Sequence, residues 1–146
     1  MRYILLLSIL FGLAAPMRGP EPVGGLEPAV RGPEPFILEH ERDIAQVQPG
    51  PHNGTGTTIA YSFFAHAQGL TLVFRKRVLL PGASIGYHLQ EKDEIYYILS
   101  GSGTMRMNDS SFTVRAGDAV LTRPGSSHGV FAGADTLVVL INYLQK

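Results

Sequence analysis

The feature that most restricts the fold of this chain is a series of short segments rich in β-branched and aromatic residues. They cover residues 59–65, 70–80, 85–90, 95–100, 103–107, 111–115, 119–122, 129–131 and 136–143. Turn-forming pairs such as Pro81-Gly82 and Pro124-Gly125 separate them. Many short strands at this spacing predict an all-β sandwich or barrel, and no segment shows a helical period. The short apolar run 36–38 predicts a further edge strand.

The length and composition fit one small domain with many turns. The chain has 146 residues, with Gly 17, Pro 10 and Cys 0. The absence of cysteine excludes disulfides, thiolate metal sites and a cysteine nucleophile. The formal net charge is zero, so no nucleic-acid partner and no acidic membrane surface is expected.

The N-terminus resembles a secretory signal peptide, which we predict over residues 1–15. Arg2 precedes the apolar run 3–13, which is too short to span a hydrocarbon core of about 30 Å. Gly12 and Ala14 place small residues where a cleavage site after Ala14 needs them. This pattern predicts a secreted or periplasmic protein with no stable membrane span after cleavage. The alternatives are an uncleaved anchor and a start codon that has been placed too early.

The next segment, residues 16–35, is dense in proline and glycine and has no apolar period. Such a segment cannot bury enough surface to offset its ordering entropy, so we predict a disordered linker there. The folded domain is predicted over residues 36–146.

Candidate metal ligands gather in the stretch 81–101. His88 and Gln90 are two residues apart, so on a strand both side chains leave the same face. Glu94 follows at the start of the next apolar run. His128, after the turn at Pro124-Gly125, can supply a second imidazole from another strand. These side chains can converge on one ion if their strands face a common interior.

The spacing of these residues resembles the two sequence motifs of the cupin superfamily. In the first motif, a histidine, a second position that is usually histidine, and a glutamate lie between two glycines. The second motif runs from a glycine through a proline–glycine turn to a histidine. The matching positions here are Gly82, His88, Gln90 (in place of the second histidine), Glu94 and Gly101, then Gly117, Gly125 and His128, with Pro124 displaced by one residue and Ala132 in place of an asparagine.

This resemblance covers about residues 70–143 and implies a double-stranded β-helix, the cupin jelly-roll barrel. It also implies one divalent transition metal (Fe, Mn, Ni, Cu or Zn) inside the barrel. The implied ligands are His88, Gln90, Glu94 and His128, and the ligand types alone do not select the metal. Because family members often pair through their outer sheet, the resemblance further implies a homodimer.

Three residues are predicted to act on a substrate or ligand. Glu94 is the candidate to alternate between metal ligand and general base. Tyr96, two residues further along the strand, points inward and is a candidate catalytic and substrate-binding group; the alternative is a core tyrosine with a satisfied hydroxyl. His52, in the glycine-rich loop 48–58, is a candidate substrate-binding residue; the alternative is an exposed loop histidine without a role.

The function that follows is an exported metal-binding cupin that acts on or binds a small oxygen-rich molecule. As an enzyme it would be a metal-dependent dioxygenase (an oxidoreductase), isomerase or lyase. The alternative is a non-catalytic cupin that binds a sugar or a carboxylate; a storage role is less consistent with a short single-domain chain. Arg75 and Arg77 share one face of their strand, and we expect that face to be solvated rather than to bind an anion beside the metal.

Overall fold

A computed structural model describes residues 35–145, so the predicted signal peptide and the linker up to residue 34 lie outside the described residues. Within this range no helix is long and apolar enough to cross a membrane. The elements in chain order are α1 (Glu41–Ile44), β1 (Ala45–Pro49), β2 (Thr57–Phe63), β3 (Leu72–Leu79), β4 (Ser84–Leu89), β5 (Glu94–Ser100), β6 (Ser102–Met107), β7 (Ser110–Arg115), β8 (Ala119–Thr122), β9 (Ser127–Ala132) and β10 (Leu137–Leu144).

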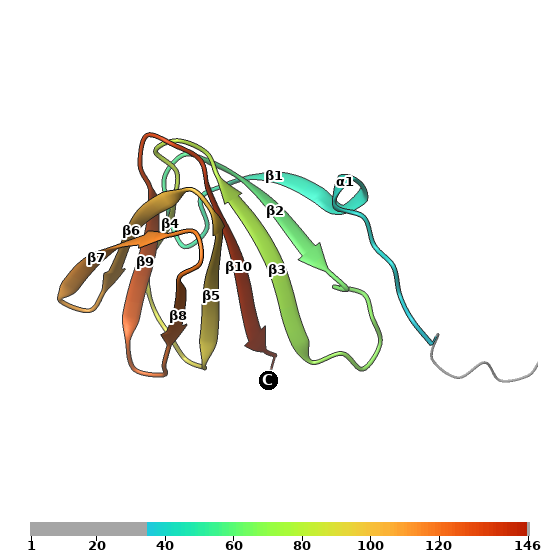
Figure 1. The fold of residues 1–146 in the computed structure, drawn as a ribbon. Coiled ribbons are helices and arrows are strands. Elements are labelled where there is room, and N and C mark those ends of the chain that lie inside the picture. Colours follow the sequence, from blue (N-terminus) through green and yellow to red (C-terminus); the bar gives the residue numbers. More distant parts are fainter. Residues whose placement is uncertain (1–34, 146) are drawn as a thin grey trace, which may run out of the picture. The chain divides into compact units, whose positions relative to one another are not determined.

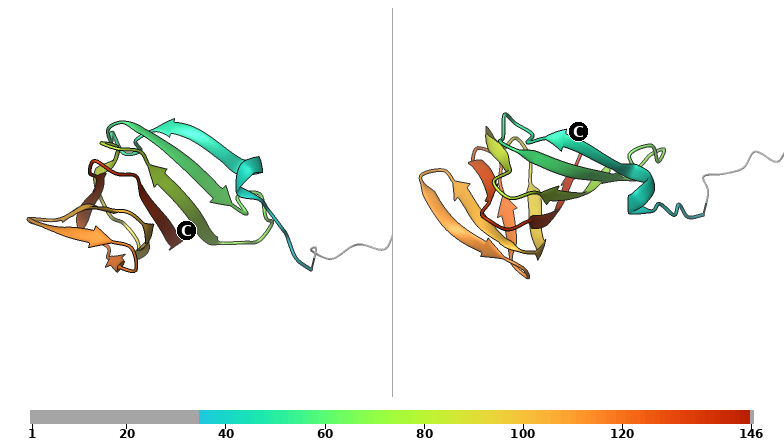
Figure 2. Two further views of the ribbon diagram at one scale, coloured as in Figure 1. Left: turned by 45° about the horizontal axis from the view of Figure 1, so that its top comes forward. Right: turned by 90° about the horizontal axis from the view of Figure 1, so that it is seen from above.

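The strands form two antiparallel sheets that face each other (Figures 1 and 2). The larger sheet has the order β1-β2-β3-β10-β5-β8, and the smaller one has the order β4-β9-β6-β7. Neighbours in each sheet come from distant parts of the chain: β10 lies between β3 and β5, and β9 lies between β4 and β6. This is the predicted jelly-roll barrel, and the prediction of an all-β fold is confirmed.

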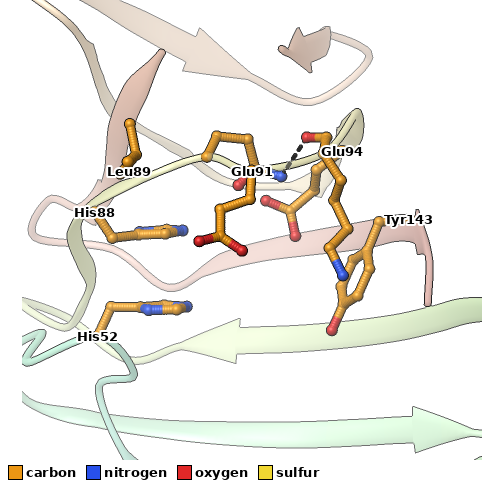
Figure 3. A pocket seen from close by; sticks show the side chains of 8 residues that line it. His52, His88, Leu89, Glu91, Glu94 and Tyr143 are labelled. Carbon is orange, nitrogen blue, oxygen red and sulfur yellow. Dashed lines mark hydrogen bonds between the residues drawn. The ribbon is translucent and has the colours of Figure 1, made fainter. Parts of the chain in front are cut away.

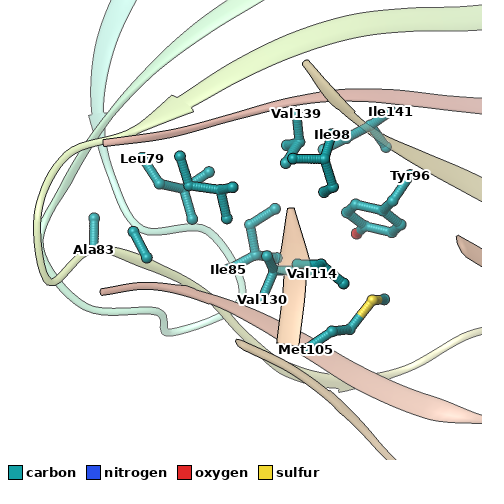
Figure 4. Packing of buried hydrophobic residues seen from close by; sticks show 12 residues of the cluster. Leu79, Ala83, Ile85, Tyr96, Ile98, Met105, Val114, Val130, Val139 and Ile141 are labelled. Atoms are coloured by element: carbon teal, nitrogen blue, oxygen red, sulfur yellow. The ribbon is translucent and has the colours of Figure 1, made fainter. Parts of the chain in front are cut away.

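Side chains alternate along the strands between the barrel interior and the solvent, and those that point inward fill the space between the sheets. In β5 the side chains at 94, 96 and 98 are buried, whereas those at 95, 97 and 99 are exposed. The core is aliphatic at its centre and includes Leu79, Ile98, Met105 and Val130 (Figure 4). Tyr96 belongs to the same cluster, so the apolar core runs directly up to the candidate metal ligands.

The predicted segments after residue 58 match strands β2 to β10 within a few residues, but the start of the domain differs. Residues 36–38 form no strand, and Phe36 is 78% exposed, so the predicted edge strand there is wrong. The edge strand is β1, which pairs with β2 from Ala45↔Tyr61 to Pro49↔Thr57. The sequence of β1, AQVQP, has a single β-branched residue and gives little β signal. Backbone pairing to β2, rather than burial, makes it a strand.

A β-bulge in β4 points His88 into the barrel. Ile85 pairs with Val130 and His88 with His128, so β4 contains one residue more than the facing stretch of β9. Strict alternation would put Ile85 and His88 on opposite faces. The extra residue lets Ile85 stay in the core while His88 faces the same interior from the end of the strand.

The loop between β1 and β2 lies directly against β4. The amide of Gly86 donates to the carbonyl of Pro51 at 2.9 Å, and Ser84 donates to that of Thr55 at 2.9 Å. A Cβ on Gly86 would overlap the carbonyl oxygen of His52. The glycine inside β4 therefore permits a close backbone approach.

We expect Gly86→Ala to destabilise the domain, because the added methyl has no space unless the loop moves away. The expected loss in free energy of unfolding is roughly 1–3 kcal/mol, measured by urea denaturation. Gly133→Ala is the matched control, because a Cβ there would meet nothing within 4 Å. Equal stability of the two variants would contradict this account of the loop.

Candidate metal centre

Two histidines lie side by side on adjacent strands of the smaller sheet, at one end of the barrel. His88 and His128 are paired positions in β4 and β9, and their ring centroids are 4.4 Å apart. The Nδ1 of His88 lies 2.8 Å from the carbonyl oxygen of Gly86. A carbonyl only accepts, so this Nδ1 carries a proton, and in the neutral ring Nε2 is then the nitrogen with a lone pair for a metal. Metal-bound histidines are commonly oriented in this way.

His128 and Glu94 are buried, and each has a polar atom without a partner. The Nε2 of His128 lies 3.0 Å from the hydroxyl of Tyr96 and 3.4 Å from Oε2 of Glu94. Within the described residues, Nδ1 of His128 and Oε2 of Glu94 make no hydrogen bond. Unpaired buried polar atoms are costly and are rare in folded proteins.

A divalent cation bound between His128 and Glu94 would give the unpaired Oε2 of Glu94 a partner. The ligand atoms of His88, Glu94 and His128 lie within 4.8 Å of one another, and two imidazoles with one carboxylate form a common set for divalent transition metals. The residues present therefore fit a metal ion, and the structure brings together three of the four predicted ligands.

Gln90, the fourth predicted ligand, is also buried and lies at the edge of the same group. Its Nε2 donates to the carbonyl of Lys92 at 2.6 Å, which leaves Oε1 as the atom available to a ligand. It lines an open cavity of about 280 Å³ together with His52, His88, Glu94 and Tyr143 (Figure 3). Glu91 and Lys92 also line this cavity, and sequence reasoning had given them no role.

His52 reaches this cavity from the β1–β2 loop. Its ring stacks on that of His88, with centroids 3.6 Å apart and planes 3° from parallel. Figure 3 shows the two rings one above the other, both pointing to the side of the pocket where Glu91 and Glu94 lie. Burial and the neighbouring His88 lower the pKa of His52. The structure thus places the predicted substrate-binding histidine at the site, although its side chain is still exposed to solvent.

The prediction that Arg77 lies on a solvated face is wrong, because its side chain points into the barrel. It is 3% exposed, and its Nη1 donates to Oγ1 of Thr58 at 2.8 Å. Arg75, on the same face, donates to Oγ of Ser62 at 3.2 Å. Lys76 takes the outer face, over the ring of Tyr61. Both faces of β3 carry apolar residues, so alternation alone could not show which face was inside.

A recess of about 60 Å³ connects these arginines with one candidate metal ligand, Glu94. Its lining includes His52, Arg75, Arg77, Glu94 and Tyr96. Burial lowers the pKa of Arg77, with Arg75 as the next cause; an arginine nevertheless stays protonated. The recess therefore places two positive charges beside the candidate metal ligand Glu94.

Tyr96 lies between the ligands and the core. Burial raises its pKa well above the usual value, with the Glu94 carboxylate as the second cause. The phenol therefore remains protonated and can donate a hydrogen bond. In the structure its hydroxyl is next to His128, so it holds that imidazole in place and also faces the recess.

Comparisons with known proteins agree with this architecture. The sequence profile of the Cupin domain family matches residues 76–142. A curated relative, "Oxalate-binding protein" of Thermotoga maritima, is 41% identical over 59 residues, which are 40% of this chain and 49% of the relative. The chain thus spans about half the length of that curated relative.

Solved structures give the same fold over most of the described domain. A Thermotoga maritima protein described as a predicted oxalate decarboxylase has a TM-score of 0.68 and 27% identity, and the match covers 75% of this chain and 100% of that chain. A cupin 2 conserved barrel protein from Salinispora arenicola has a TM-score of 0.60 at 20% identity, covering 75% of this chain and 88% of its own. From the profile match, these barrels and the motif residues in place, the domain that contains residues 76–142 is a cupin domain.

Proposed function

We propose that this protein binds a small carboxylate, with oxalate as the model ligand, through a divalent transition metal, the buried Arg77 and the half-buried Arg75. The observation that carries the proposal is the recess that joins Arg77 and Arg75 to Glu94. In the described part of the chain, neither arginine forms an ion pair, and Arg77 makes a single hydrogen bond. A buried guanidinium without a counterion is costly, so an anionic ligand is expected to provide the missing charge.

The formal charges of the site favour a dianion over a neutral sugar. A divalent ion and two arginines bring four positive charges, of which Glu94 offsets one; Glu91 and Lys92 at the outer cavity cancel each other. Three positive charges therefore face the space left for the ligand. A planar guanidinium can bind a carboxylate with two parallel hydrogen bonds, which a sugar hydroxyl cannot match.

In this proposal each residue has a distinct task. His88, Glu94 and His128, with Gln90 beside them, hold the ion, which when bound acts as a Lewis acid with an open position for a ligand oxygen. Arg77 and Arg75 neutralise and orient the far carboxylate. Tyr96 keeps His128 in place and offers its hydroxyl to the recess. The substrate-binding role predicted for Tyr96 remains part of the proposal.

The curated relative supports the ligand class, because its name states that it binds oxalate. The test is isothermal titration of the full-length protein with oxalate, before and after loading with Mn²⁺, Co²⁺ or Zn²⁺. We expect binding that requires the metal, weaker binding of acetate and none of glucose. Absence of metal binding, or oxalate binding no stronger than glucose binding, would reject the proposal.

A second candidate function is turnover of the same ligand by a metal-dependent lyase. The neighbour described as a predicted oxalate decarboxylase, matched over its full length at 27% identity, favours it. In such a reaction hydrogen oxalate gives formate and carbon dioxide, with Glu94 as the group placed to move the proton. Formate assayed after incubation of the metal-loaded protein with oxalate distinguishes turnover from binding alone.

Export and dimerisation are also proposed, each on its own ground. The proposal of export is based on the N-terminal pattern, and N-terminal sequencing of the mature protein tests it.

The proposal of a homodimer is based on the larger sheet, whose outer face has exposed aliphatic side chains at Leu72, Ile95, Leu121 and Leu144. Light scattering on the purified protein measures the mass directly.

A further inference from the structure

We infer that His52 is an additional metal ligand, which supplies from the β1–β2 loop the imidazole that position 90 lacks. The inference rests on the metal-binding function proposed above. It concerns a residue outside both cupin motifs, more than thirty positions before His88 in the chain.

The backbone of the loop is built to hold His52 at this place. The amide of Gly50 donates to the carbonyl of Gly56 at 3.1 Å and closes the loop. The amides of Gly54 and Gly86 both donate to the carbonyl of Pro51, at 3.0 and 2.9 Å. With Pro51 fixed to β4 in this way, the next residue has little freedom to move away from the barrel mouth.

The loop keeps His52 in an unfavourable backbone conformation. His52 has φ 53° and Asn53 has φ 58°, both in the left-handed region. For residues other than glycine this costs roughly 1 kcal/mol each. In this conformation the imidazole of His52 lies against that of His88. Such strain is typical of functional sites.

The stacking places the imidazole of His52 next to a candidate ligand. The ring centroids of His52 and His88 are 3.6 Å apart and the ring planes are nearly parallel. His52 is outside the group of ligand atoms that lie within 4.8 Å of one another. Its ring would therefore shift toward the ion when the ion binds, while the loop backbone stays in place.

The ligand at position 90 explains why an imidazole from His52 would strengthen metal binding. Gln90 offers a neutral amide oxygen, a harder and weaker ligand for transition metals than an imidazole. With His52 the protein would again provide three imidazoles and one carboxylate. A merely stacking role for His52 would need the flat ring but not its nitrogen lone pair, and this difference can be tested.

The experiment compares full-length wild type with His52→Phe, which keeps a flat ring over His88 but has no ligand nitrogen. His52→Asn is the second variant, because asparagine tolerates a positive φ. His66→Phe is the matched control, since His66 is exposed in the β2–β3 connection and lines neither cavity. Each protein is titrated with Co²⁺ against a competing chelator, its visible absorption spectrum is recorded, and thermal unfolding of the metal-free form checks the fold.

We expect both His52 variants to bind Co²⁺ about 10- to 100-fold more weakly, with a changed spectrum, and His66→Phe to match wild type. Wild-type affinity and spectrum in His52→Phe would overturn the inference and leave the proposed function intact. No Co²⁺ binding by wild type would instead reject the proposed function itself. If His52→Phe does not fold, the same comparison is made with His52→Asn.

Discussion

Replacing His128 with glutamine is expected to lower the affinity for a divalent transition metal at least about 100-fold, the upper end of what changes around a metal ligand cause. His128 is fully buried and belongs to the group His88, Glu94 and His128 whose ligand atoms lie within 4.8 Å of one another. Glutamine keeps most of the volume and can still pair with the hydroxyl of Tyr96. The measurement is metal content by elemental analysis after loading and dialysis.

The matched control is His66→Gln, the same substitution at an exposed position away from both cavities. It should retain one metal ion per chain. A second variant, His88→Ala, tests the opposite side of the pair, where the side chain is only half-buried and truncation leaves a smaller defect. Full metal content in both His128→Gln and His88→Ala would show that the ion binds at another place in the protein.

Most of the fold was predictable because the signals are local. Strands β2 to β10 end at turns such as Gly82, Gly101, Gly117 and Gly125, all of which have positive φ. The beginning of the domain was not predictable in this way. β1 has little β propensity and becomes a strand only because the backbone of β2 is available as a partner.

The candidate site was predictable only where the ligands follow a fixed spacing within the motifs. His88, Glu94 and His128 were named from that spacing, and the structure brings them together. The bulge before His88 was not foreseen; Gly86, a glycine inside the strand, is its only sign in the sequence of β4. His52 was named as a candidate, but its contact with His88 depends on the packing of a loop on a distant strand.

Arg77 shows a different limit of sequence reasoning. Positive residues in a strand are usually solvated, and the expectation of an outer face followed that rule. The actual direction is set by the register of β3 in the sheet, which puts Arg77 opposite Val139 and Ala60, both buried. Only the pairing of three strands, not the sequence of one, reveals that this arginine faces the interior.

Arg77→Met is expected to reduce the affinity of the metal-loaded protein for oxalate at least about tenfold and to leave metal content unchanged. The variant removes a buried guanidinium that forms no ion pair with the described residues and lines the recess beside Glu94. A hydrogen bond to a charged group contributes about 1.5–3 kcal/mol, so losing one corresponds to roughly 10- to 150-fold in affinity. Titration calorimetry with oxalate measures the change, and Arg77→Lys, which keeps the charge but not the planar fork, should fall between.

The same substitution, Arg77→Met, is expected to weaken oxalate binding but to increase the stability of the ligand-free protein. Without ligand, Arg77 is a buried charge that lacks a counterion, and methionine of similar length can fill the space without that cost. We therefore expect the free energy of unfolding of ligand-free Arg77→Met to exceed that of wild type, by roughly 1 kcal/mol or more. Arg106→Met is the control, because Arg106 is exposed over the ring of Tyr87 and should change neither quantity appreciably. A less stable Arg77→Met that still binds oxalate like wild type would mean that the arginine supports the barrel and does not bind a ligand.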